Sequence, residues 1–338
     1  MAQINTEKEY QAAMARIEEL LPLTCEDGTP EDSPENIELS LLSDLVAEYE
    51  DIHYPIGISE LISKTDINAD KIHLMNNLRI CYIQANLFWQ DKQANLEHFS
   101  QLLKEVPSDT DLVLLPETFN TAFPVDPIQF AETPDGPTMN WLRTKAQELN
   151  AVICGTMLLN LDGHYHNSLV WMRPDGSHEL YHKRHTFTLG GENPPIEHGS
   201  EQLIVELNGW RIKPMVCYDI RFPVWSKNHF ENGQYDYDLG IYLANFPAPR
   251  INVWNTLLQA RAIENQAYFV GVNRVGDDSE GIHYSGCSQV LNAKGEIISM
   301  AKSDMEDVVP CVLDYEKLQS FREKFPVGKD WDSFTLNH

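Results

Sequence analysis

The chain of 338 residues lacks several features that would place it in a familiar class of proteins. It contains no run of eighteen apolar residues, which excludes a membrane-spanning helix. Its N-terminal segment has no basic start followed by a short apolar core, so we expect no secretory signal. The six cysteines show neither a CxxC pair nor a regular spacing. This excludes a disulfide framework and favours reduced thiols in a cytoplasm.

Basic residues are also scarce in this chain. There are 25 lysines and arginines against 51 aspartates and glutamates, which gives a formal net charge of −26. This excess argues against nucleic acid or an anionic membrane as the main partner and leaves a small molecule or another protein. The sequence has no G-x-S-x-G motif and no glycine-rich nucleotide loop, which disfavours a serine hydrolase or a dinucleotide enzyme.

Residues 1–74 differ in composition from the rest of the chain, and we assign them to a separate domain. The first 76 residues hold 17 acidic and four basic residues, a net charge of −13 and half of the total. From Met75 onward, strands are predicted to alternate with helices, and a methionine could itself start such a domain. The predicted domains are therefore an acidic helical extension, 1–74, and a larger domain, 75–338.

The extension is predicted to form a hairpin of two amphipathic helices. The first covers residues 6–21, where Thr6 and Glu9 have the spacing of a capping box. The second covers residues 36–55, ends at Pro55 and follows a polar loop rich in proline and glycine. The apolar stripe of the first helix consists of Tyr10, Ala13, Met14, Ile17, Leu20 and Leu21.

This hairpin resembles the one that precedes the DNA-binding part of HigA-type antitoxins. No helix-turn-helix is recognisable in residues 56–75, so the resemblance does not imply DNA binding for this chain. An acidic helical extension that serves packing or oligomerisation is the simpler interpretation.

The larger domain is predicted to be an α/β fold in which hairpins are mixed with β–α units. Strands are predicted at 78–87, 111–118, 151–159, 209–218, 237–246 and 267–275. Helices are predicted at 91–106, 137–150 and 252–266, and hairpins at 165–185 and 287–299. One parallel sheet would have fewer hairpins, so two mixed sheets packed face to face and covered by helices fit better.

Three polar side chains occur at the ends of predicted strands. Glu117 ends the run VLLPE, Lys183 ends the second strand of the first hairpin, and Cys217 ends the strand before Pro223. Proline suits the first turn of a helix, so Cys217 lies where a strand turns toward a helix. A buried lysine and a buried glutamate are each costly, and their pairing offsets part of that cost.

These three residue types suffice for amide hydrolysis through a thioester. A thiol with a pKa of about 8.5 is only a few per cent thiolate near pH 7, so it needs a base such as a carboxylate. An ammonium and the backbone N–H that follows the cysteine can hold the oxyanion that forms on a carbonyl. Such a site needs neither a metal nor a catalytic histidine.

Other candidate residues have less specific interpretations. Asp219 and Arg221 are expected to brace the bend at Cys217 rather than to react. A metal site would need a third and a fourth ligand beside the histidines, and none is evident, so we predict none. The histidines considered are His164, His166, His182 and His185. Four cysteines are predicted to be core thiols, since free cysteine behaves as a small hydrophobe: Cys81, Cys154, Cys287 and Cys311.

The segments LLPETFN, YHKRH and VCYDIRFPVW, in this order, resemble the three catalytic motifs of the nitrilase, or carbon–nitrogen hydrolase, superfamily. The resemblance covers residues 77–338 and includes ANFPAPR and LLQARAIENQAYFVGVNRVG. Within the superfamily it points to the bacterial YafV-like ω-amidases and their Nit2-like animal relatives. It implies a four-layer αββα sandwich that forms a homodimer or a higher homo-oligomer, with sheets and helices stacked across the subunits.

The matched motifs imply a role for each residue. Glu117 resembles the general base, which later protonates the departing ammonia and activates the deacylating water. Lys183 resembles the lysine that stabilises the oxyanion, and Cys217 resembles the nucleophile. Glu192, in preference to Glu197 in the same loop, resembles the second glutamate that orients the lysine and the substrate.

Three more residues are assigned to substrate binding. The N–H of Tyr218 would complete the oxyanion site, and Arg250 offers a cation to a substrate carboxylate. Phe246 belongs with Arg250 to the motif ANFPAPR. The implied reaction hydrolyses the terminal amide of a small keto-acid amide, such as 2-oxoglutaramate, to the carboxylate and ammonia without a cofactor.

Two alternatives stay open at this stage. One is another amidase of the superfamily that acts on a deaminated-glutathione-like or N-carbamoyl substrate. The other is a non-catalytic regulatory or binding protein on the same fold, although the intact Glu117, Lys183 and Cys217 count against it. Nothing in these residues separates a nitrile substrate from an amide.

Overall fold

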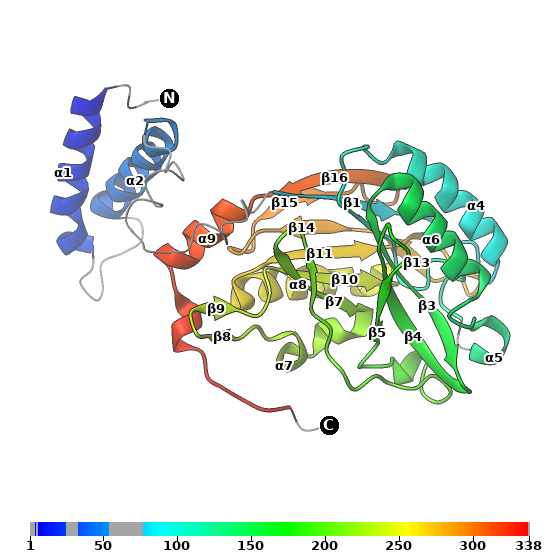
Figure 1. Cartoon of the computed structure of the whole chain (residues 1–338). Helices are drawn as coiled ribbons and strands as arrows, with labels where there is room; N and C mark the ends of the chain where they lie inside the picture. The colour runs from blue at the N-terminus through cyan, green and yellow to red at the C-terminus, as the bar shows by residue number, and fades with distance from the viewer. Residues whose placement is uncertain (1–3, 5, 25–32, 54–76, 125, 337–338) are drawn as a thin grey trace. The chain divides into compact units, whose positions relative to one another are not determined.

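The computed structural model describes residue 4 and residues 6–24, 33–53, 77–124 and 126–336 (Figure 1). The chain divides into two compact units, one within residues 1–72 and one within residues 73–338. The predicted domain boundary at Met75 lies outside the described residues, so the exact division into 1–74 and 75–338 stays a prediction. Residues 56–75, whose sequence contains no recognisable helix-turn-helix, lie outside them as well.

The first unit contains the predicted helical hairpin. Its helices are α1 (Glu7–Thr24) and α2 (Pro34–His53). Thr6 and Glu9 form the predicted capping box: Oγ1 of Thr6 accepts the N–H of Glu9 at 3.3 Å, and the Glu9 carboxylate accepts the N–H of Thr6 at 3.0 Å. The two helices pack through stacked rings of Tyr10 and Tyr49, whose centroids are 5.1 Å apart.

The second unit is built on two six-stranded mixed sheets. In the first sheet the strand order is β16–β1–β2–β3–β4–β5, and β1, β2 and β3 are parallel. Its strands are β1 (Leu78–Gln84), β2 (Leu112–Leu114), β3 (Val152–Leu161), β4 (His164–Met172), β5 (His178–His182) and β16 (Asp307–Leu313). In the second sheet the order is β15–β14–β11–β10–β7–β6, and β7, β10 and β11 are parallel. Its strands are β6 (Val205–Leu207), β7 (Trp210–Val216), β10 (Leu239–Ala244), β11 (Tyr268–Asn273), β14 (Gln289–Leu291) and β15 (Ile297–Met300).

Shorter elements complete the second unit. Two small hairpins pair β8 (Phe230–Glu231) with β9 (Gln234–Tyr235) and β12 (Val275–Asp277) with β13 (His283–Ser285). The α-helices are α4 (Lys92–Leu102), α5 (Pro127–Phe130), α6 (Pro137–Leu149), α7 (Pro223–Ser226), α8 (Ile251–Asn265) and α9 (Tyr315–Lys324). The 3₁₀ turns are η2 (Leu103–Glu105), η3 (Thr188–Gly190), η4 (Cys217–Arg221), η5 (Ala248–Arg250) and η6 (Val327–Asp330).

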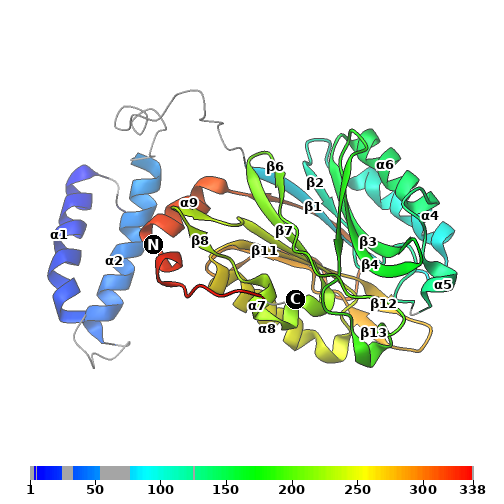
Figure 2. The same ribbon diagram turned by 60° about the horizontal axis from the view of Figure 1, so that its bottom comes forward.

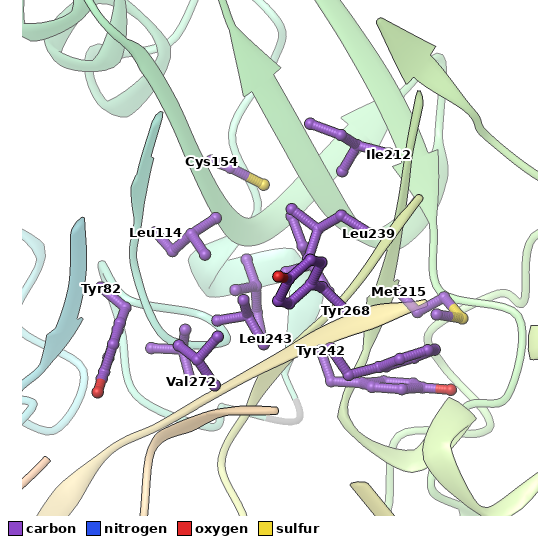
Figure 3. Packing of buried hydrophobic residues seen from close by; sticks show 14 of the residues in the cluster. Tyr82, Leu114, Cys154, Ile212, Met215, Leu239, Tyr242, Leu243, Tyr268 and Val272 are labelled. Carbon is purple, nitrogen blue, oxygen red and sulfur yellow. The ribbon is translucent and has the colours of Figure 1, made fainter. Parts of the chain in front are cut away.

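The two sheets pack face to face and form the main core. Figure 3 shows Tyr82 and Leu114 of the first sheet near Leu243 and Val272 of the second. Helices α4 and α6 cover the outer side of the first sheet, and α8 covers the outer side of the second (Figure 2). The predicted αββα sandwich is therefore confirmed. None of the helices in the described parts of the chain is long and apolar enough to cross a membrane.

Five of the six strands that were predicted outside the hairpins are shorter in the structure, and two of these shortened strands are followed by residues that donate a backbone N–H to a distant side chain. The strand predicted at 111–118 ends at Leu114: Leu115 still donates its N–H to Cys154, but Pro116 has no N–H to continue the pairing, and Thr118 has a positive φ of 42° and donates its N–H to the Thr156 side chain at 2.7 Å. The strand predicted at 237–246 ends at Ala244, because the next N–H, that of Asn245, donates to the Glu117 carboxylate. A side-chain acceptor thus replaces the strand partner directly at the end of β10.

The prediction for the cysteines is right for two residues and wrong for two. Cys81 and Cys154 are buried, but Cys287 and Cys311 are only partly buried. Cys287 lies in the loop between β13 and β14 with a positive φ of 58°, not in a strand, and Cys311 lies on the edge strand β16. Cys81 and Cys154 lie on strands β1 and β3, which have a neighbouring strand on each side, whereas Cys311 does not. Apolar neighbours in the sequence therefore predicted burial correctly only on the inner strands.

Candidate active site

The four predicted catalytic residues lie together beside the ends of three strands. Lys183 directly follows β5, Cys217 directly follows β7, and Glu117 comes three residues after β2. Nζ of Lys183 lies 2.8 Å from Oε1 of Glu117 and 2.7 Å from Oε2 of Glu192. Glu117 and Lys183 follow strands of the first sheet and Cys217 follows a strand of the second, so the site forms where the two sheets meet.

Cys217 occupies a sharp bend between β7 and α7. Its φ of 41° is unusual for a residue with a side chain, and the 3₁₀ turn η4 that begins there leads to Pro223 at the start of α7. The predicted strand-to-helix bend is therefore confirmed. Its Sγ atom lies 3.9 Å from the carbonyl oxygen of Asn245, and the residue is 8% exposed.

The buried carboxylate of Asp219 braces this bend, as predicted. One oxygen accepts the N–H of Val216 at 3.0 Å and the hydroxyl of Tyr181 at 2.7 Å. The other accepts the backbone N–H of His185 at 2.9 Å. Asp219 thus joins the end of β7 to the segment that carries Lys183, which holds nucleophile and lysine at a fixed separation.

Lys183 is completely buried between two carboxylates. Burial alone would lower the pKa of its ammonium, but the charges of Glu117 and Glu192 outweigh this and raise that pKa above its usual value. The side chain is therefore a permanent cation. Among the hydrogen bonds of the described residues, its ammonium uses two of its three N–H groups, one for each glutamate.

Glu117 and Cys217 both have raised pKa values. Burial raises the pKa of Glu117, and the charge of Lys183 opposes this effect. Burial also raises the pKa of the Cys217 thiol well above its usual value, and the carboxylate of Glu117 adds to that shift. Cys217 is thus a neutral thiol at rest beside a carboxylate with an increased affinity for a proton. This pair is suited to proton transfer from sulfur to Glu117.

Two asparagines that were not predicted from the sequence complete the site. Asn167 on β4 donates through Nδ2 to Glu117 at 2.9 Å and to Glu192 at 3.0 Å. Asn245 donates its backbone N–H to Oε2 of Glu117 at 2.9 Å. Asn245 follows directly after a strand, so the criterion that selected Glu117, Lys183 and Cys217 would also have selected it.

The residues assigned to substrate binding lie at different depths. Tyr218 is half-buried, and its ring lies 4.9 Å from that of Phe187. Phe246 is buried against Trp254, with ring centroids 5.4 Å apart. Arg250 is exposed, and its guanidinium lies 5.6 Å from the ring of Phe187. Phe187 in turn donates its N–H to Glu192, so Arg250 is connected to the site through one aromatic ring.

The other candidate residues lie outside the cluster of Glu117, Lys183, Glu192 and Cys217 or have a structural role. Glu197 is exposed and pairs with His164 at 2.9 Å, so Glu192 is the glutamate of this loop that reaches Lys183. The ring of His185 bonds to Asp219 at 2.8 Å, and His166 stacks on His182. Within the described ranges, no group of three or more His, Cys, Asp or Glu side chains is arranged to hold a metal ion.

The chain is similar to known proteins over most of its second unit. The family model named carbon-nitrogen hydrolase matches residues 79–323. Omega-amidase YafV of Yersinia enterocolitica is 44% identical over 262 residues, which cover 78% of this chain and 100% of that protein. The 2-oxoglutaramate amidase of Bacillus subtilis is 26% identical over 254 residues, which cover 74% of this chain and 96% of that protein.

One solved structure is similar over the same region. XC1258 from Xanthomonas campestris, a CN-hydrolase superfamily protein with an arsenic adduct in its active site, is 42% identical with a TM-score of 0.76. The match covers 78% of this chain and 100% of that protein. The family match and the 44% identical relative show that the chain belongs to the carbon–nitrogen hydrolase family.

Proposed function

We propose that the protein is an ω-amidase that hydrolyses the terminal amide of a small keto acid of the 2-oxoglutaramate type. The observation that carries this proposal is the buried ammonium of Lys183 between Glu117 and Glu192, beside the neutral thiol of Cys217 on a strained bend. The names of the YafV and 2-oxoglutaramate amidase relatives support the choice of substrate. The exposed cation of Arg250 beside the site is compatible with a substrate carboxylate.

The acylation half-reaction follows from these contacts. Glu117 takes the proton of the Cys217 thiol while sulfur bonds to the amide carbon. The carbonyl electrons move to oxygen, and the resulting oxyanion accepts the free N–H of Lys183 and the N–H of Tyr218. The C=O bond then re-forms, the C–N bond breaks, and the nitrogen leaves as ammonia with the proton from Glu117.

Deacylation repeats the sequence with water as the nucleophile. Glu117 takes a proton from water while the water oxygen bonds to the thioester carbon, and the same donors hold the oxyanion. Breaking the C–S bond releases the carboxylic acid, and the thiolate of Cys217 regains the proton from Glu117. Glu192 touches Lys183 and Asn167 in the structure, so its role in both halves is to orient the ammonium.

We expect the enzyme to release ammonia from 2-oxoglutaramate with a higher kcat/KM than from a neutral primary amide of similar length. A carboxylate on the substrate can pair with Arg250, and a neutral amide cannot. Ammonia release measured across a panel of small ω-amides and N-carbamoyl compounds tests this. A preference for the N-carbamoyl or the neutral amides would contradict the proposed substrate while leaving the amidase chemistry intact.

The variant Arg250→Ala tests whether Arg250 causes the preference for a substrate that carries a carboxylate. Losing a charge-assisted hydrogen bond typically reduces binding by about 1.5–3 kcal/mol, and solvent screening at an exposed arginine favours the lower end. We therefore expect a roughly tenfold loss in kcat/KM for 2-oxoglutaramate and little change for the neutral amide. The matched control is Arg79→Ala, an exposed arginine on β1 that pairs with Asp109. Equal losses for both substrates would leave Arg250 as a structural residue.

We also propose that residues 1–74 form a separate extension that contributes nothing to turnover, since every proposed catalytic group lies beyond Met75. A chain that begins at Met75 is expected to fold and to keep most of its activity, which circular dichroism and ammonia release would measure. An insoluble or inactive product would mean that the extension belongs to the catalytic unit or to its assembly.

A cytoplasmic homodimer is proposed for the assembled protein. The family resemblance implies the dimer, and the five described cysteines are all free, which suits a reducing compartment. Sedimentation of the full chain would measure the assembly directly, and a monomer would contradict the dimer.

A further inference from the structure

Asn167 bridges the two glutamates of the site as an uncharged counterpart of Lys183. Its side chain is 1% exposed, and its Nδ2 atom donates to Oε1 of Glu117 and to Oε1 of Glu192. Its backbone carbonyl accepts the N–H of Lys183 at 2.9 Å, which places the amide beside the ammonium. The opposite amide orientation would turn an oxygen toward two carboxylates, so the chemistry itself fixes the assignment.

The hydrogen bonds show which donors and acceptors of Asn167, Lys183 and the two glutamates are used and which are not. Oε1 of Glu117 accepts from both Asn167 and Lys183, and Glu192 accepts from Asn167 through Oε1 and from Lys183 through Oε2. Both N–H groups of the Asn167 amide are used, and one N–H of Lys183 is free of both carboxylates. The Oδ1 atom of Asn167 has no hydrogen-bond partner among the described residues. The carboxylates alone therefore account for the side-chain hydrogen bonds of this asparagine.

Loss of the two N–H donors of Asn167 would change which acceptors the N–H groups of Lys183 bind. A buried carboxylate oxygen without a donor is costly, and the adjacent unused donor is the third N–H of Lys183. If that N–H turns toward a glutamate, it is no longer available to stabilise the oxyanion. A second ammonium at this place would satisfy the same oxygens, but its charge would hold Glu117 ionised and weaken it as a base.

We propose that Asn167 is a positioning residue that keeps one N–H of Lys183 available to the oxyanion and keeps Glu117 competent as the base for Cys217. The oxyanion half of this inference rests on the proposed function. The Glu117 half does not, because the reactivity of the sulfur can be measured without any amide turnover.

Alkylation of Cys217 by iodoacetamide tests the second half. In this reaction sulfur bonds to the CH₂ carbon, iodide leaves, and the thiol proton passes to Glu117, so the rate falls at low pH as Glu117 becomes protonated. The groups that face Glu117 are Lys183, Glu192 and Cys217. Loss of the amide donor in Asn167→Ala disfavours the charged carboxylate, which raises its pKa and moves the acid limb of the rate profile to higher pH by about one unit.

Two further variants separate positioning from folding. Asn167→Asp keeps the shape but adds a third carboxylate, so the acid limb should move further than in Asn167→Ala. The control is Asn228→Ala, since Asn228 is equally buried and its Nδ2 also makes two hydrogen bonds, to Tyr237 and Asn265 outside the site. Mass spectrometry of the Cys217 peptide gives the rate at each pH, and the control should leave the acid limb unchanged.

Turnover tests the first half. With 2-oxoglutaramate, Asn167→Ala should reduce kcat by about 10²–10³, as loss of an oxyanion donor does, with KM changed less than about threefold. An unchanged acid limb in both Asn167 variants, or a loss of kcat no greater than in Asn228→Ala, would overturn the proposal. If the acid limb shifts in the Asn167 variants but the wild type does not hydrolyse 2-oxoglutaramate, only the proposed substrate is overturned, and the role of Asn167 toward Glu117 stands. If Asn167→Ala fails to fold, the shape-conserving Asn167→Asp decides.

Discussion

Replacing Cys217 by alanine should reduce kcat to the level of the reaction without enzyme, a loss of at least about 10⁴-fold. Glu117, Lys183 and the bend at Cys217 would all persist, but no atom in the site could form the thioester. Ammonia release from 2-oxoglutaramate measures the loss. Because the thiol is uncharged in the folded protein, Cys217→Ala should leave the thermal midpoint of unfolding nearly unchanged.

A matched cysteine shows whether the effect is specific. Cys311→Ala removes a partly buried thiol from the edge strand β16, and we expect it to keep full activity. One equivalent of iodoacetamide should inactivate the wild type and Cys311→Ala alike, and substrate should protect both. Measurable turnover in Cys217→Ala would rule out the thioester mechanism.

The second large effect is expected for Lys183→Met. The variant removes the only side-chain cation that contacts Glu117 and Glu192 among the described residues, so two buried carboxylates lose their partner. Breaking a buried ion pair by removing one partner typically destabilises a protein by about 3–5 kcal/mol, and the loss of an oxyanion donor reduces kcat by about 10²–10³. Both losses should appear for every amide substrate, since all form the same oxyanion.

Lys213→Met is the matched control for this variant. Lys213 is also buried, on β7, but it contacts Gln202 at 2.8 Å and no carboxylate within salt-bridge distance among the described residues. Burial lowers its pKa to about 8, so its ammonium is destabilised in the folded state. Its replacement should therefore leave activity intact and leave stability near pH 7 unchanged or raised. A lowered midpoint with full activity in Lys183→Met would make that lysine purely structural.

The sequence predicts much of this site because its signals are local. Glu117, Lys183 and Cys217 each stand at the end of a predicted strand, and Pro223 marks the bend after Cys217, so these signals can be recognised from nearby residues alone. Asn167 carries no such signal. Asn167 and His166 are consecutive residues of one strand, so their side chains point to opposite faces of the sheet. Only the pairing of β4 with β3 and β5 determines which of these two side chains faces the site. That pairing depends on contacts between distant segments.

The same distinction explains the predictions that differ from the structure. Cys287 directly precedes the apolar strand β14 in the chain, but it lies in the loop between β13 and β14, where its positive φ is defined only by the folded backbone. The strand before Asn245 ends early because the Glu117 carboxylate, 128 residues away in sequence, accepts the next N–H. An acceptor so remote in sequence leaves no mark on the local pattern of apolar and polar residues.

The site has a consequence for how the protein acquires its activity. Glu117 and Lys183 belong to the first sheet, whereas Cys217 and Asn245 belong to the second, and the hydrogen bond from Asn245 to Glu117 joins them. Neither sheet alone carries a nucleophile with its base, so activity requires that the two sheets are packed against each other. A change that separates the sheets would therefore remove activity even where each sheet keeps its own strands.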